Sequence, residues 1–149
     1  MEQVQTRLLV PALAPFYRRV SDFSYPLIRI AVGAPMLVHG VGKLMAGPAP
    51  VIASMERIGI QPAAPMAYAL MFLETVGAIC IILGLFTRFF AAALCIESLV
   101  LVFVAHWPNG FPANRNGVEM VMTWAIIYFA IALRGGGPWS LDRKLGREL

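Results

Sequence analysis

Residues 65–106 read PMAYALMFLETVGAICIILGLFTRFFAAALCIESLVLVFVAH and contain two long apolar runs separated by a short turn sequence. A helix needs about 20 apolar residues to cross a hydrocarbon core of roughly 30 Å. We therefore expect two transmembrane helices here, at about 65–86 and 88–106. The turn from Gly84 to Arg88 is so short that the two helices must form an antiparallel hairpin.

Two further apolar stretches flank this hairpin. The first, at about 24–45, contains Pro35 near its middle, where a kink is expected. The other, at about 117–133, ends at the glycine-rich sequence of residues 135–138. The sequence thus predicts an all-α membrane protein, a single domain over residues 1–149 that folds as a four-helix transmembrane bundle.

The overall composition excludes a typical water-soluble domain. Of the 149 residues, 59% are hydrophobic and only 13% are charged, and the mean hydropathy is +0.73. No basic run is typical of a nucleic-acid-binding patch, so no nucleic-acid partner is expected. The two cysteines, Cys80 and Cys95, lie in apolar stretches without CxxC spacing, which favours neither a thioredoxin-like motif nor a cysteine zinc site.

The basic residues predict the orientation of the chain. Four crossings place both termini on one side of the membrane. With the termini lie Arg7, Arg18, Arg19, Arg88, Arg134, Arg143, Lys144 and Arg147, and on the opposite side lie Lys43, Arg57 and Arg115. Because positive residues favour the cytoplasm, residues 1–23 are expected to form a cytoplasmic or interfacial segment and residues 134–149 a cytoplasmic tail.

Several ionisable residues lie inside the predicted helices, where a charge at mid-bilayer costs at least about 2.5 to 3.5 kcal/mol. They are Arg29, His39 and Lys43 in the first helix, Glu74 in the second, Glu97 and His106 in the third, and Glu119 at the start of the fourth. Each is expected to face the bundle interior with a partner. A purely structural interpretation stays open, in which these charges lock the helices together and Arg29 forms an ion pair with a glutamate.

Depth along the helices groups most of these residues into one predicted pocket. Near the outer ends of their helices lie His39, Lys43, His106 and Glu119. Glu74 lies about 13 Å deeper and would form the floor of the pocket, with Glu97 at a similar depth. Imidazole and carboxyl groups together suit proton-coupled chemistry. A bis-histidine haem or a metal site is disfavoured, because no haem-attachment or ligand motif accompanies the histidines.

Four motifs, in this order, give the chain a resemblance to the DoxX family of small four-helix membrane proteins. They are Arg29 followed by His39-Gly40-Val41-Gly42-Lys43, then Phe72-Leu73-Glu74 with Gly84-Leu85-Phe86-Thr87-Arg88, then Gly117-Val118-Glu119, and last Gly-x-Gly-x-x-Ser-Leu-Asp over 135–142. Together they span about residues 25–143. Glu97 matches no family motif, so its role rests on depth alone.

The resemblance implies a redox role, as an integral subunit of a quinone-linked oxidoreductase system in the inner membrane of a bacterium. Glu74 and His39 are expected to be catalytic and to handle protons. The expected substrate-binding residues are Arg29, Lys43, His106, Glu119 and Glu97. Quinone is the cofactor that the resemblance implies, and none is expected to be covalently bound. Because the sequence has neither GxGxxG nor a cysteine cluster, electrons are expected from a partner protein or a small substrate.

Two other functions also fit the sequence. One is a non-enzymatic membrane scaffold that recruits a soluble redox partner through the basic tail and the proline-rich outer loop. The other is a small proton-coupled transporter, for which four helices without visible repeats would have to form a homo-oligomer. The expected partners are therefore membrane lipid, a soluble or membrane redox protein, or a second copy of the chain.

Overall fold

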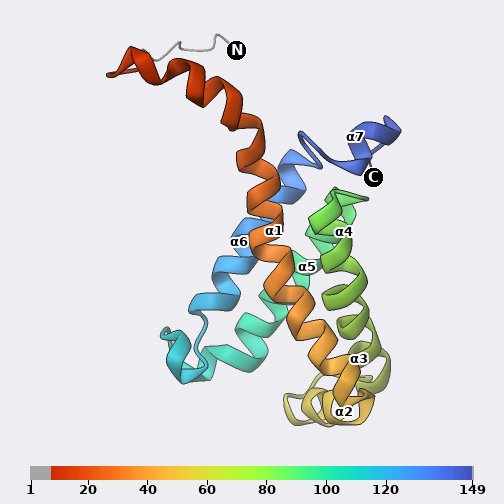
Figure 1. Ribbon diagram of the computed structural model, residues 1–149. Coiled ribbons are helices and arrows are strands. Elements are labelled where there is room, and N and C mark those ends of the chain that lie inside the picture. Colours follow the sequence, from red (N-terminus) through yellow and green to blue (C-terminus); the bar gives the residue numbers. More distant parts are fainter. Residues whose placement is uncertain (1–7, 149) are drawn as a thin grey trace.

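The computed structural model describes residues 8–148, and every regular element in that range is helical. Three continuous helical stretches are long and apolar enough to cross a membrane, namely Pro11–Ala46, Ala63–Leu83 and Thr87–Asn109. The helices run up and down the bundle in turn (Figure 1). Residues 1–7 and Leu149, which belong to the expected N-terminal segment and tail and include the basic Arg7, lie outside the described residues.

Helix α1, Ala14–Ala46, begins well before residue 24, where the first span was expected to start. It has 33 residues and contains Pro26 and Pro35, neither of which can donate a backbone hydrogen bond. A short 3₁₀ segment, η1 (Pro11–Leu13), precedes it. The first turns of α1 project away from the bundle (Figure 1). The described part of the expected surface segment is therefore a helical arm continuous with the first span.

The second span is built from three consecutive helical pieces. They are α3 (Ala63–Phe72), the π-helical segment η2 (Leu73–Gly77) and α4 (Ala78–Leu83). The span ends at Gly84, whose left-handed backbone (φ 69°) a glycine adopts without steric cost. The helix α2 (Pro48–Arg57) lies in the connection from α1 and packs against α3.

The third span and the last long helix pack along each other. The third span consists of α5 (Thr87–Leu101), the π-helical η3 (Val102–His106) and the 3₁₀ turn η4 (Trp107–Asn109). After a second 3₁₀ turn, η5 (Ala113–Arg115), comes α6 (Glu119–Arg134). Helix α6 has 16 residues, fewer than the about 20 that a crossing normally takes. Helix lengths alone therefore identify three membrane spans.

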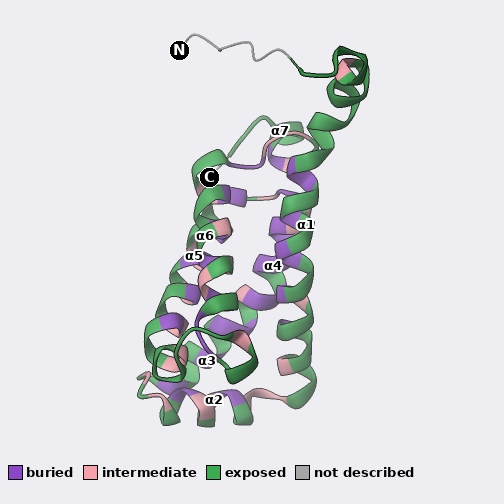
Figure 2. Cartoon of the chain, turned by 90° about the vertical axis from the view of Figure 1, so that its left-hand side faces the viewer, coloured by how far each residue is buried: buried purple, intermediate pink, exposed green. Residues whose placement is uncertain are grey.

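Buried residues face the inside of the bundle and exposed residues its outside (Figure 2). The buried set includes polar side chains, and the exposed set includes many large apolar ones. The buried polar residues are Arg29, Glu74, Thr75, Thr87, Ser98, Ser140 and Asp142. Large apolar residues such as Ile79, Phe89, Ile96, Phe103 and Phe129 are exposed. An apolar exterior of this extent is stable against lipid and not against water. Burial thus agrees with an integral membrane protein.

The segment after α6 folds back onto the end of the bundle. Its short helix α7 (Leu141–Leu145) carries Asp142, which is 1% exposed. Oδ1 of Asp142 accepts a hydrogen bond from the Phe86 amide (2.7 Å), and Oδ2 accepts from the amide (2.9 Å) and the hydroxyl (2.6 Å) of Thr87. The described residues of the expected cytoplasmic tail are therefore a structural cap on the turn between α4 and α5.

Candidate functional site

Gly40 lets α1 lie directly against the π-helical segment η2. A Cβ atom at this position would lie 2.5 Å from the carbonyl oxygen of Glu74 and 2.6 Å from Cγ2 of Thr75. A side chain has no room there, so glycine is what allows the two backbones to approach so closely. The contact brings the next turn of α1, which carries Lys43, beside Glu74.

Lys43 and Glu74 form an ion pair between α1 and η2. The Lys43 ammonium donates a hydrogen bond to Oε2 of Glu74. Glu74 is only 4% exposed, whereas the Lys43 side chain retains 31% of its accessible surface. A carboxylate at this depth needs a partner, because taking a lone charge out of water costs several kcal/mol. Lys43 supplies that partner from the more exposed side of the bundle.

The two π-helical segments carry two of the predicted pocket residues, η2 in the middle of the second span and η3 near the end of the third. Segment η2 contains Glu74, and η3 ends with His106. At the wide turn of η2, Oγ1 of Thr75 donates a hydrogen bond to the Met71 carbonyl at 2.6 Å. Single π-helical turns recur at functional sites in proteins. The two segments therefore favour the region around Glu74 and His106 as the candidate functional site.

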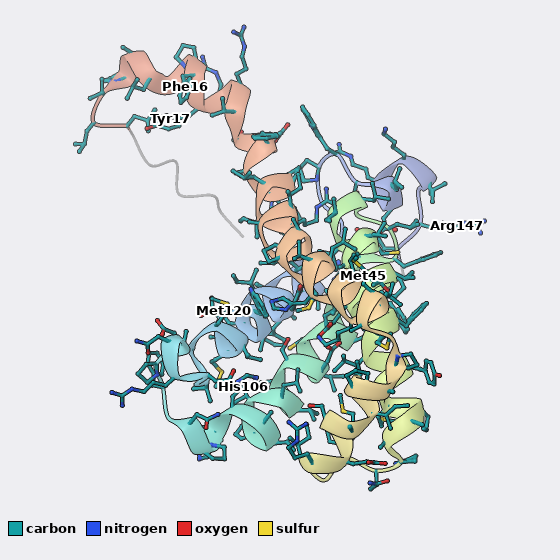
Figure 3. The ribbon with its side chains drawn as sticks, turned by 60° about the horizontal axis from the view of Figure 1, so that its bottom comes forward. Phe16, Tyr17, Met45, His106, Met120 and Arg147 are labelled. Atoms are coloured by element: carbon teal, nitrogen blue, oxygen red, sulfur yellow. The ribbon has the colours of Figure 1, made fainter. Side chains whose placement is uncertain are left out.

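A cavity of about 330 Å³ lies where α1, η2, α5 and α6 meet. Polar groups in its lining come from His39, Lys43, Glu74, Glu97, Ser98, His106 and Asn116. Figure 3 shows two lining residues, His106 and Met120, on adjacent parts of the chain. A second, more open hollow of about 700 Å³, bordered by α2, shares several of these residues. Even without this hollow, the smaller cavity is of a size that small ligands occupy in proteins.

His39 stands at the edge of this cavity and packs against an aromatic ring of α6. Its ring centroid lies 5.5 Å from that of Trp124, and the two rings are inclined by 72°. This edge-to-face arrangement is a favourable one for aromatic side chains. His39 is exposed and lines the cavity, so its imidazole is accessible from it.

His106 is oriented by the loop before α6. Its Nδ1 lies 2.8 Å from the carbonyl oxygen of Asn116. A carbonyl can only accept, so Nδ1 carries the hydrogen and donates. In the neutral ring Nε2 is then left as the acceptor. Asn109 donates to the same carbonyl at 3.1 Å and helps to hold the loop in place.

Glu97 joins the polar cavity to an apolar groove. It lines both the 330 Å³ cavity and a groove of about 350 Å³ between the α3–η2 stretch and α5. The groove is lined mainly by apolar side chains, including Met66, Leu70, Ile96 and Val100. Oε2 of Glu97 is buried and has no hydrogen-bond partner in the part of the chain that the structure describes. This carboxyl group therefore has unused hydrogen-bonding capacity at the junction.

Glu119, which was expected to bind substrate, does not line the cavity. It is exposed, and its Oε2 accepts a hydrogen bond from the Ala113 amide at 2.9 Å. It also lies in the first turn of α6, where a negative charge is favourable. The structure thus gives Glu119 a role in holding the loop, and its charge also suits the start of α6.

Arg29, also expected to bind substrate, lies toward the other end of the bundle. It is 1% exposed, and its Nη2 donates to the Trp139 carbonyl at 3.2 Å. Within residues 8–148 no carboxylate lies within 4.0 Å of it, so the expected ion pair with a glutamate is not found there. Arg29 lines none of the cavities described above.

Among the polar and aromatic residues of the cavity lining, sequence reasoning missed three. Ser98 directly follows Glu97 in an otherwise apolar run, and that signal could have identified it. Asn116 and Trp124 had no comparable signal, because their positions depend on how α6 and its loop pack across α5. Among the described residues no group of three histidine, cysteine, aspartate or glutamate side chains is placed to hold a metal ion.

Comparison with known proteins supports a family assignment. The sequence model of the DoxX family matches residues 25–107, which is more than half of the chain. An uncharacterized protein of Haemophilus influenzae is 30% identical over 124 residues, covering 81% of this chain and 90% of that protein. An uncharacterized membrane protein of Mycobacterium tuberculosis is 30% identical over 133 residues, covering 81% of this chain and 80% of that protein.

No solved structure matches the chain. The DoxX match nevertheless contains Gly40, the ion pair of Lys43 with Glu74, and Glu97. The apolar spans and buried charges of the chain are those of an integral membrane protein. The chain therefore belongs to the DoxX family.

Proposed function

We propose that this chain is the quinone-interacting membrane subunit of an oxidoreductase system. One observation carries the proposal: Glu97 lines both a cavity with ionisable groups and an apolar groove. Quinones combine two oxygens that gain or lose protons with a ring and tail that are apolar. A molecule of that kind fits a place where an apolar groove leads to ionisable side chains.

The lining of the cavity suits an oxygen ligand. Lys43 uses one N–H to reach Glu74, and an ammonium group has two further donors. The free Oε2 of Glu97 is an acceptor for a hydroxyl group. A positive charge beside the cavity also stabilises negative charge that develops on an oxygen. The chain's own residues thus provide both a donor and an acceptor.

We assign proton transfer to Glu74 and His39, with Glu97 as a third proton carrier. Lys43 stabilises charge, and His106 offers its Nε2 as an acceptor at the cavity wall. Arg29 and Glu119 are left out of this scheme, because neither lines the cavity. Electrons have to come from a soluble or membrane redox partner, since the sequence has no GxGxxG motif and no cysteine cluster.

The proposal includes a topology in which α6 is a fourth crossing and both termini face the cytoplasm of a bacterium. In support, α7 and the start of α1 lie at the same end of the bundle (Figures 1 and 2). That end carries Arg18, Arg19, Arg88, Arg134, Arg143, Lys144 and Arg147. Positive residues favour the cytoplasmic side, which points to the inner membrane.

Binding of decylubiquinone to the purified full-length protein in mild detergent tests the function. Trp124 borders the cavity, so binding should quench tryptophan fluorescence. Glu97→Gln and Glu74→Gln keep the side-chain shape but remove the ionisable carboxyl group, and each should weaken binding about tenfold. The matched control is Glu56→Gln, an exposed glutamate on α2 that lines none of these cavities, and its affinity should equal that of the unmodified protein.

The result also separates the alternatives. If the unmodified protein does not bind decylubiquinone, or if Glu56→Gln weakens binding as much as Glu97→Gln, the quinone role is wrong. A scaffold for a soluble redox partner then becomes the better explanation. Proton flux into liposomes that is lost in Glu97→Gln, without quinone binding, would instead support a proton-coupled transporter.

A further inference from the structure

Three arginines surround a hollow at the other end of the bundle, where α6 meets α7. This hollow, about 420 Å³ in volume, is lined by Arg134, Arg143 and Arg147 together with Asp142 and Glu148. We call it the arginine basin. It is separate from the 330 Å³ cavity between α1, η2, α5 and α6, and the two share no lining residue.

The two carboxylates of the arginine basin are already engaged. Asp142 uses both oxygens to cap the start of α5. Glu148 accepts from Nε of Arg88 at 2.8 Å and from the Gly136 amide at 3.0 Å, again with both oxygens. Among residues 8–148 neither carboxylate pairs with an arginine of the basin. The basin therefore keeps a surplus of positive charge.

The negative end of α6, which would repel an anion, is also compensated. The guanidinium of Arg88 donates to the carbonyls of Ala132 (3.0 Å), Leu133 (2.7 Å) and Arg134 (3.3 Å). These are the carbonyls that a helix leaves without partners at its C-terminus. Arg88 thus removes the main electrostatic obstacle to an anion beside Arg134.

Arg134 is held in position by an aromatic ring. Its guanidinium carbon lies 4.4 Å from the ring centroid of Tyr25, a cation–π contact. The Tyr25 hydroxyl in turn donates to the Gly135 carbonyl at 2.6 Å. Arg143 and Arg147 are exposed on and just after α7, and Figure 3 shows Arg147 extending outward from the C-terminal segment. All three arginines are exposed and line the same hollow, and Arg134 is in addition anchored by Tyr25.

We propose that the arginine basin binds the phosphate group of an anionic membrane phospholipid. Arginine matches phosphate oxygens through paired N–H donors. The surroundings favour a lipid as the source of that phosphate. Trp139 is 69% exposed and Leu145 is 64% exposed next to the basin, and tryptophan is enriched where membrane meets water.

Native mass spectrometry of the full-length protein in detergent tests this site, with phosphatidylglycerol and phosphatidylcholine added at equal concentration. The unmodified protein should retain phosphatidylglycerol preferentially. The double variant Arg143→Gln/Arg147→Gln should bind it about 25-fold more weakly, at roughly fivefold for each arginine. Neither side chain donates a hydrogen bond within the described residues, so the thermal unfolding midpoint should not change.

The matched control is Arg18→Gln/Arg19→Gln, which removes the same charge from the exposed arm of α1. Its binding of phosphatidylglycerol should fall far less. Equal losses in the two double variants would show a general effect of net charge and overturn the proposal. Equal retention of phosphatidylcholine, or displacement of the lipid by the same concentration of inorganic phosphate, would overturn it as well. Decylubiquinone binding should be unaffected throughout, so this site and the quinone role can fail separately.

Discussion

The bundle has a capped end, closed by the segment after α6, and an open end, which holds the 330 Å³ cavity. Each end uses a carboxylate differently. At the capped end, Asp142 fills both oxygens with hydrogen bonds from the turn between α4 and α5. At the open end, Glu97 has a buried oxygen without a partner in the described part of the chain, and it borders a cavity. A satisfied carboxylate in packed surroundings holds a structure together, whereas an unsatisfied one beside open space can bind or transfer protons.

Arg29 also shows that the surroundings of a charged group decide its role. Its place inside a predicted membrane helix and in a family motif made it a candidate for substrate binding, and the same two features made Glu74 a candidate for catalysis. The structure packs Arg29 against the backbone of Trp139, away from any of the cavities of the open end. Nε and Nη1 of Arg29 have no hydrogen-bond partner among the described residues, so a buried, incompletely paired charge does not by itself mark a chemical site. Only the space around the charge distinguishes a structural role from a chemical one.

Asp142→Ala should have the largest effect on stability. It would leave the partly buried Phe86 amide and the two buried donors of Thr87 without acceptors. Each buried donor that loses its partner costs about 1 to 3 kcal/mol, and single substitutions rarely cost more than about 5 kcal/mol. The free energy of unfolding should therefore fall by about 3 to 5 kcal/mol. Unfolding in detergent, followed by circular dichroism, measures this loss. The control is Asp22→Ala on the exposed face of α1, and a similar loss there would refute the capping role.

Gly40→Ala should have an intermediate effect, at the open end. The new Cβ would lie 2.5 Å from the Glu74 carbonyl oxygen, so α1 must move away from η2 at a cost of about 1 to 3 kcal/mol. Decylubiquinone affinity should fall as Lys43 separates from Glu74. Gly42→Ala is the matched control, because a Cβ there meets nothing within 4 Å and alanine favours the helix by up to about 1 kcal/mol. If Gly40→Ala raised the unfolding midpoint as Gly42→Ala should, the close contact would be dispensable.

Glu119→Gln should have the smallest effect. Its carboxylate holds one loop amide at the surface, so its charge is worth about 0.5 kcal/mol of stability. Because Glu119 does not line the cavity, decylubiquinone affinity should equal that of the unmodified protein. A tenfold loss of affinity in this variant would return Glu119 to the site and weaken the distinction between the two ends.

Much of the architecture follows from local sequence. Apolar runs of the length of residues 65–106 predict membrane helices because lipid has a known thickness and cannot hydrogen-bond to the backbone. The turn at Gly84 and the charges inside the spans are likewise local features. The start of α1 at Ala14 was missed, because its first turns contain arginines and prolines that local reasoning assigns to a surface segment.

The sequence by itself determined the class of the protein, its apolar spans and the residues whose burial needs explanation, because hydrophobic length and charge are properties of short segments. The tertiary structure alone decided that Lys43 pairs with Glu74, that Glu97 borders open space, and that Asp142 caps a turn 55 residues away. Each of these three features depends on segments that are far apart in the sequence and packed together, as α1 and η2 are at Gly40. The distance between two side chains on different helices is set by packing, which no single segment encodes.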